Sequence, residues 1–243
     1  METPPADITR IIEALSECSQ DFIQFWDEKG NPEVESGNSP DVLIEALVNL
    51  FDLLYTQEVG DKKLTQDELS ELGQYGMNLL QALSLDTESI GYEGHQNFED
   101  ISFPLGLWLA RNQAEITTLD PLVNTLARIA NRLVHPEELE ALFNQSSEIY
   151  DAISVTLTQD LEQGHQDSAW SIFLVNRGII ATRTLNTTII ELAYSAIAEY
   201  LPEISHEFFT EGMEQMELLD YPPTVREVVE RFYNQSKTLQ LLH

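Results

Sequence analysis

The sequence predicts an all-α protein of about nine helices, packed as an antiparallel bundle or as a short α-solenoid of helical pairs. Apolar residues recur at steps of three and four along most of the 243 residues, and prolines stand where such helices would begin. No stretch shows the sustained apolar–polar alternation, with Asn-Gly or Asp-Gly turns, that is typical of a β-hairpin. With 42% hydrophobic and 22% charged residues, the composition is that of a globular protein.

The first predicted helix covers residues 5–29 and has one apolar stripe. A connection rich in Gly, Asn, Ser and Pro follows, and Ser39-Pro40 is typical of a helix start. In the second helix, 41–58, the polar residues form a single narrow stripe, which predicts a largely buried helix. That stripe consists of Asp41, Glu45, Asn49 and Asp52.

A third helix begins after Thr65, because Thr65 and Glu68 have the spacing of a capping box. We expect it to end near Leu85. Residues 86–100, with Gly91, Gly94 and His95, show little periodicity and predict a polar loop that serves as a lid or a linker. The expected organisation is an N-terminal helical subdomain (1–85), this segment, and a C-terminal helical subdomain (101–243), or one continuous domain.

The C-terminal part predicts a series of helices joined by short connections, which favours antiparallel neighbours. A tetratricopeptide-type repeat with a period of about 34 residues is not found. The expected ranges are 103–112, 120–134, 136–161, 168–185, 187–201, 202–219 and 222–238.

The charge balance is strongly acidic, with 42 Asp and Glu against 12 Lys and Arg and a formal net charge of −30. Such a surface repels phosphate backbones, so we expect no nucleic-acid partner. Solubility, adaptation to high salt and recognition of a basic partner all remain open as reasons for the acidity.

Targeting and membrane signals are missing from the sequence. The N-terminus has no basic start or apolar run, and the most apolar stretch, 169–182, is shorter than the roughly 20 residues that span a bilayer. The single cysteine, Cys18, fits a reducing compartment. We therefore expect a cytoplasmic protein without a membrane association.

Arg177 is the main candidate for an anion site, because it lies in the acid-free, strongly apolar segment 168–190. A helix that is apolar on every side belongs in a core, and a buried guanidinium needs a carboxylate or an anionic ligand. An internal ion pair is one interpretation. The other is an anion pocket to which Arg128 and Arg132, four residues apart on another helix, also contribute.

Catalytic signatures are absent from the sequence: there is no Gly-x-Ser-x-Gly, Walker-type or dinucleotide-binding motif. We therefore predict no catalytic residue; the pattern favours a non-enzymatic protein and leaves an enzyme as the alternative. If a catalytic histidine exists, His95 in the loop with Gly91 and Gly94 is the candidate. An exposed loop histidine is the simpler interpretation.

A metal site is suggested by two Glu-x-x-His motifs, Glu162 to His165 and Glu203 to His206, a spacing used in di-iron bundles. Gly164 and Pro202 place these motifs at helix ends rather than inside helices, and no cofactor is expected. The acids between Glu203 and Glu217 lie opposite the apolar side of their helix, so they predict a solvated face rather than a cation ladder.

These observations favour a helical interaction protein, an adaptor or assembly factor, that receives a partner peptide or helix in a groove between helices, and a basic partner is one option. Two alternatives are a small-molecule or anion-binding protein, or enzyme, with an arginine-lined pocket, and a metal-binding helical bundle. The oligomeric state is left open by the sequence.

Overall fold

The computed structural model describes residues 7–34, 39–60, 63–159 and 168–240. In these residues the secondary structure is helical apart from one isolated bridge, so the predicted all-α class is confirmed. Twelve helices occur there, more than the nine expected, partly because two short helices were not foreseen. None of these helices is both long and apolar enough to cross a membrane.

Two compact units make up the fold. The N-terminal unit contains Pro4–Thr125 and Glu148–Ser154, and the C-terminal unit contains Leu126–Ser147 and Val155–His243. Helices α6 (Asp120–Arg132) and α7 (Pro136–Ala152) contribute residues to both.

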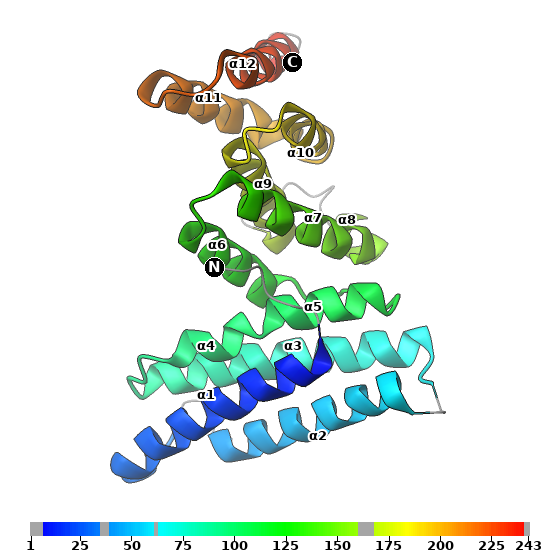
Figure 1. Ribbon diagram of the computed structural model, residues 1–243, viewed down its shortest axis with the longest axis vertical. Helices are drawn as coiled ribbons and strands as arrows, with labels where there is room; N and C mark the ends of the chain where they lie inside the picture. Colours follow the sequence, from blue (N-terminus) through cyan, green and yellow to red (C-terminus); the bar gives the residue numbers. More distant parts are fainter. Residues whose placement is uncertain (1–6, 35–38, 61–62, 160–167, 241–243) are drawn as a thin grey trace. The chain divides into compact units, whose positions relative to one another are not determined.

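The N-terminal unit is built on α1 (Ile8–Glu28), α2 (Pro40–Val59) and α3 (Gln66–Ser89), of which α2 packs against both α1 and α3. Figure 1 shows α1 and α2 side by side and antiparallel, with α2 at the edge of this layer. Pro40 occupies the first turn of α2, as predicted. Glycines on α3 allow close approach: a Cβ on Gly73 would lie 2.6 Å from Leu109, and one on Gly76 would lie 2.7 Å from Leu50.

The start of α3 confirms the predicted capping box. The Glu68 amide donates to the Thr65 hydroxyl at 3.3 Å, and the Thr65 amide donates to the Glu68 carboxylate at 2.8 Å. These two bonds satisfy amides that the first turn of a helix leaves free.

Residues 86–100 are not the irregular loop that was expected. Helix α3 continues to Ser89, four residues past Leu85, and α4 (His95–Asp100) follows a short turn. The apolar periodicity did not predict α4 because this helix is only six residues long, too short to show a repeating apolar face. Helix α5 (Ser102–Arg111) follows directly and packs against α1 and α3.

The predicted helix 136–161 is divided in two. Ile116 pairs with Ile153: its amide donates to the Ala152 carbonyl at 2.8 Å, and its carbonyl accepts from Ser154 at 3.0 Å. This pairing takes backbone groups from the helical ladder, so α7 ends at Ala152 and α8 (Val155–Gln159) begins afterwards.

The C-terminal unit is formed by the later helices, α9 (Ala169–Arg183), α10 (Thr187–Tyr200), α11 (Pro202–Leu218) and α12 (Pro223–Gln240). Its core contains an aromatic cluster in which Tyr194 contacts Phe208, Phe209 and Phe232. The Tyr194 hydroxyl lies 2.8 Å from that of Thr182, and burial raises the pKa of Tyr194 to about 12. Tyr194 is therefore a neutral core residue that joins α9 to α10, α11 and α12.

Two predictions about helix faces in this unit have different outcomes. The glutamates of α11 are exposed, as expected for a solvated face; they are Glu203, Glu207, Glu211, Glu214 and Glu217. Helix α9, expected to be buried on every side, exposes Ile172 and Ile179. These two residues are one heptad apart on the same face of α9, opposite the contacts that Arg177 and Gly178 make.

Candidate partner-binding groove

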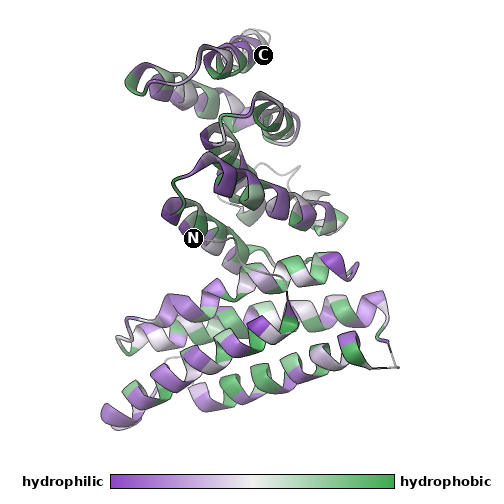
Figure 2. Ribbon diagram, viewed as in Figure 1, coloured by the Kyte–Doolittle hydropathy of each residue, from purple (hydrophilic) through white to green (hydrophobic). Residues whose placement is uncertain are grey.

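The outer surface of α2 departs most clearly from the sequence prediction. Its narrow polar stripe predicted a largely buried helix, yet five large apolar side chains are exposed to solvent. They are Val42 (55%), Val48 (44%), Leu53 (42%), Tyr55 (41%) and Val59 (64%). Helix α2 thus has the composition of a buried helix but is covered on one side only, and Figure 2 shows apolar colouring along much of its length. Val48, Tyr55 and Val59 lie along one side of α2, and exposed apolar side chains that recur on one side of a helix are typical of an interaction site.

An open groove of about 260 Å³ lies between α1 and α2, within the N-terminal unit. Both walls follow from helical periodicity, since residues three and four apart occupy the same face of a helix. The α1 wall is lined by Ile12, Leu15, Ser16, Ser19, Gln20 and Ile23, and the α2 wall by Ile44, Val48, Phe51 and Asp52.

The groove has a rigid floor and an accessible apolar rim. Leu15 and Phe51 are buried and hold α1 against α2, whereas Ile23 on α1 (40% exposed) and Val48 on α2 reach solvent. The buried residues make the groove part of the folded core, and the exposed ones offer apolar surface to another molecule.

A polar atom also lies in the groove wall. Ser19 is buried, and its hydroxyl oxygen has no hydrogen-bond partner among the described residues. A buried hydroxyl without a partner is destabilising, so few such groups occur in native proteins.

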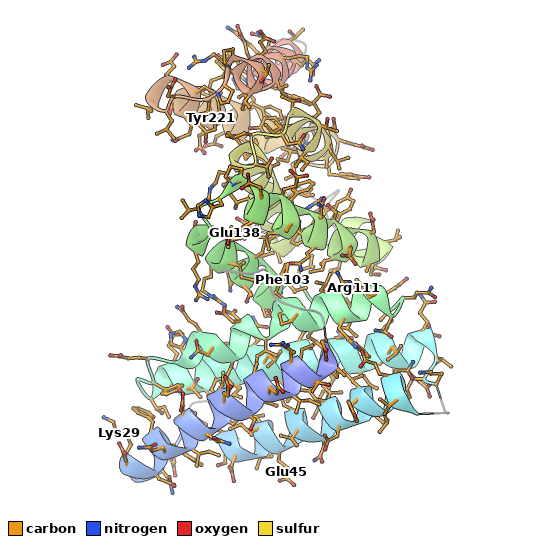
Figure 3. The ribbon with its side chains drawn as sticks, in the orientation of Figure 1. Lys29, Glu45, Phe103, Arg111, Glu138 and Tyr221 are labelled. Atoms are coloured by element: carbon orange, nitrogen blue, oxygen red, sulfur yellow. The ribbon has the colours of Figure 1, made fainter. Side chains whose placement is uncertain are left out.

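Acidic residues surround the groove. Asp52 lines it directly, Asp41 and Glu45 are exposed on the preceding turns of α2, and Glu13 and Asp27 are exposed on α1. Figure 3 shows the Glu45 side chain at the outer edge of α2. The electrostatic potential around the apolar rim is therefore negative.

A second hollow, of about 350 Å³, lies where the end of α1 meets the connection to α2. Its lining includes Trp26 and Pro32, and the Trp26 indole donates to the Pro32 carbonyl at 3.2 Å.

The segment with Gly91, Gly94 and His95 forms a tight turn that packs on α1. Gly91 has a φ of 76°, in the left-handed region that glycine favours, and a Cβ on Gly94 would lie 2.6 Å from the Tyr92 ring. Tyr92 contacts Phe22, Phe25 and Phe98. These glycines therefore serve the packing of Tyr92.

His95 is the first residue of α4, and its side chain is mostly buried. Its Nε2 is 4.0 Å from a carboxylate oxygen of Glu88, and its buried Nδ1 has no hydrogen-bond partner in the described residues. The expectation of an exposed loop histidine is thus wrong, whereas a functional role for His95 stays a prediction.

Cys18 lies on α1, close to Tyr92. Burial, together with the carboxylates of Asp21 and Glu17, raises the pKa of its thiol to about 11. The thiolate is the reactive form of cysteine, so Cys18 is a poor nucleophile at neutral pH.

Arg177 lies in the core of the C-terminal unit. Its Nη2 donates to the Ser147 hydroxyl at 2.8 Å, its Nε donates to the Ser146 hydroxyl at 3.3 Å, and its guanidinium lies over the Phe143 ring at 4.8 Å. These contacts attach α9 to α7. The predicted burial of Arg177 is confirmed, and its role in an anion pocket stays a prediction.

The two other candidate arginines are both on α6, where Arg128 is half-buried and Arg132 is exposed. Arg183, which the sequence analysis did not select, donates to the carbonyl oxygens of Ala130 and Leu133 at 2.8 and 2.7 Å and so caps the end of α6. Its position in the last turn of α9 gives no sequence signal for this contact.

The predicted metal ligands cannot be assembled, because Glu162 and His165 lie outside the described residues. Glu203 is exposed in the first turn of α11. His206 Nδ1 is 3.0 Å from the Ser236 hydroxyl, and its ring stacks on Tyr233 at 5.5 Å. Within the described ranges, no group of three or more His, Cys, Asp or Glu side chains is arranged to hold a metal ion.

The α1–α2 groove was not selected from the sequence, although a signal for it exists. Ile23 lies beside the main apolar stripe of α1 and widens it, and α2 has more apolar surface than two neighbouring helices can cover. An excess of this kind shows only when the helix is known to lie at an edge.

Comparison of the chain with protein-family models, with curated proteins and with solved structures gives no match.

Proposed function

We propose that this protein is a helical interaction protein, an adaptor or assembly factor, that binds a peptide or helix of a partner protein in the groove between α1 and α2. The observation that carries the proposal is the apolar rim of this groove, where Ile23 of α1 and Val48 of α2 are both exposed to solvent. Burial of such surface on binding is a main driving force of protein association.

The groove is suited to a protein segment rather than to a small molecule. It is open along two helices, its lining is spread over about three turns of α1 and about two of α2, and its walls contain no arginine, lysine or histidine. Small-molecule sites are usually more enclosed and contain a few convergent polar groups. This supports the interaction hypothesis over an anion-binding function at this groove.

Affinity capture from the native cell, with three baits in parallel, tests the proposal. The baits are the wild-type chain, Val48→Asp in the groove, and Leu192→Asp as a matched control on α10. Leu192 is also exposed, and the control adds the same charge in the other unit. A protein retained by the wild type and by Leu192→Asp but lost from Val48→Asp is the expected result. Identical protein sets on all three baits, or no specific protein on any, would contradict the proposal.

A further inference from the structure

We propose that the occupant of the α1–α2 groove is an amphipathic helix of a partner protein, with apolar residues on one face and Lys or Arg along both flanks. This inference rests on the proposed function and specifies the partner's secondary structure and charge.

A helix fits the spacing of the residues that line the groove. Ile12, Ser16, Ser19 and Ile23 follow one another at three- and four-residue steps on α1, as Ile44, Val48 and Phe51 do on α2, and the exposed Tyr55 continues the second row by one turn. The span from Ile12 to Ile23 is about 16 Å, or about three turns of a helix that would lie between the two rows. Apolar anchors at i, i+3, i+4 and i+7 are how amphipathic helices fill such grooves.

An extended peptide would find few backbone hydrogen-bonding groups in this groove. Strand addition depends on free backbone amides and carbonyls at a sheet edge, but the groove walls are helices whose backbone groups are bonded within each helix. Side-chain contacts must therefore supply the affinity, and a helix presents the densest row of apolar side chains on one face.

The charge around the groove determines which charge the flanks of the partner helix should have. Helix α1 has five acidic residues, Glu13, Glu17, Asp21, Asp27 and Glu28, against the single base Arg10. Helix α2 has Asp41, Glu45, Asp52 and Glu58 and no basic residue. Of these, Asp52 lines the groove, and Glu13, Asp27, Asp41 and Glu45 are exposed beside it. Basic flanks on the occupant would face these five carboxylates, whereas acidic flanks would be repelled.

The same charge argues against other occupants. A second copy of this chain would also have a net charge of −30, so association of two copies at this face is opposed by repulsion. Nucleic acids and anionic lipid surfaces are negatively charged, like the rim of the groove, and would also be repelled. A basic amphipathic helix combines the apolar and electrostatic complementarity that the groove requires.

Four synthetic peptides of about 18 residues, long enough for about five helical turns, test this inference. Three share one row of Leu and Ile at i, i+3, i+4 and i+7 and have Lys and Arg, Gln, or Glu at the remaining positions. The fourth has the composition of the basic peptide in an order without an apolar face. Dissociation constants for the full chain are measured by fluorescence anisotropy at two salt concentrations.

Val48→Asp separates groove binding from non-specific attraction. This variant makes the protein more acidic, so a peptide that binds through charge alone would bind it more tightly, while a peptide seated in the groove would bind it less tightly. Leu192→Asp adds the same charge in the C-terminal unit and is the control. Circular dichroism verifies that both variants are folded.

We expect the basic amphipathic peptide to bind at least about tenfold more tightly than the neutral and the scrambled peptides, with an advantage that shrinks at higher salt. Val48→Asp, but not Leu192→Asp, should remove most of the advantage over the scrambled peptide. Equal binding of the neutral and basic amphipathic peptides, both weakened by Val48→Asp, would overturn the basic partner and leave the groove's function standing. Affinities that do not respond to Val48→Asp would overturn both.

Discussion

Ile23 of α1 and Val48 of α2 face the same groove from opposite walls, and both are exposed although they stand among buried apolar residues. Each occupies a position where its helix has more apolar surface than its neighbours cover. An energetic cost in water is expected for such positions in the free protein, and that cost is relieved when a partner covers them.

Within the groove, the residues that stabilise the fold should therefore differ from those that are free to bind a partner. Phe51→Ala removes a fully buried ring and should lower the free energy of unfolding by about 3–5 kcal/mol. Val48→Ser, three residues earlier and exposed, should change it by less than about 0.5 kcal/mol. Urea denaturation measures both, and a large loss of stability in Val48→Ser would show that its side chain is part of the core.

The Ser19 hydroxyl provides a second stability prediction. Ser19→Ala removes a buried hydroxyl without a hydrogen-bond partner among the described residues, so the variant should be as stable as the wild type or up to about 1 kcal/mol more stable. Ser16→Ala, exposed one turn earlier, is the control for helix propensity. A clear destabilisation by Ser19→Ala relative to that control would mean that the hydroxyl makes a hydrogen bond.

The contact between Trp108 and Glu58 should be sensitive to substitution. The buried Trp108 indole donates to the Glu58 carboxylate at 2.8 Å and so joins α5 to the end of α2. Glu58→Ala leaves that N–H without this acceptor and should cost about 1–3 kcal/mol. Denaturation followed by tryptophan fluorescence measures the cost; an unchanged unfolding midpoint would argue against the contact in solution.

The contribution of Arg177 to the stability of the fold should depend on the shape of its side chain as well as on its charge. Arg177→Lys keeps the charge but cannot reproduce both hydrogen bonds to Ser146 and Ser147 or the stacking on Phe143, so it should lose about 1.5–3 kcal/mol. Arg132→Lys, on an exposed residue, is the control. Equal stability of Arg177→Lys and the wild type would contradict the contacts described here.

Cys18 should react slowly with alkylating agents in the folded protein. Burial raises its pKa from 9.0 to about 11, so at pH 8 the folded thiol has less thiolate than the unfolded one. Because the folded state holds its proton more tightly, the stabilising effect of this thiol is full below pH 9 and is lost as the pH rises towards 11. Iodoacetamide labelling followed by mass spectrometry compares native and denatured chains, and equal rates would contradict the raised pKa.

The sequence predicted the features that depend on local chemistry. The Thr65–Glu68 capping box and the exposed glutamates of α11 were both identified, because a cap and an amphipathic face are encoded within a few residues. The fold class followed from the same periodicity.

Features that depend on the neighbours of a helix were not predictable in this way. The pattern of α2 indicated burial, but which side is covered depends on how α1 and α3 pack against it, and the residues of α2 alone do not encode this packing. Helix α7 ends at Ala152 because Ile116 pairs with Ile153. The sequence of residues 136–161 gives no indication that Ile116 is the pairing partner. The candidate groove is of this second kind, since it arises only when α1 and α2 lie side by side.

Photo-crosslinking from position 48 in living cells tests the central claim most directly. A photoreactive p-benzoylphenylalanine replaces Val48 in one strain and Leu192 in another, and mass spectrometry identifies the crosslinked peptides. We predict an adduct at position 48 alone, to a segment of another protein with apolar residues at helical spacing and basic flanks. Adducts of equal yield from both positions, or none from position 48, would contradict a partner site between α1 and α2.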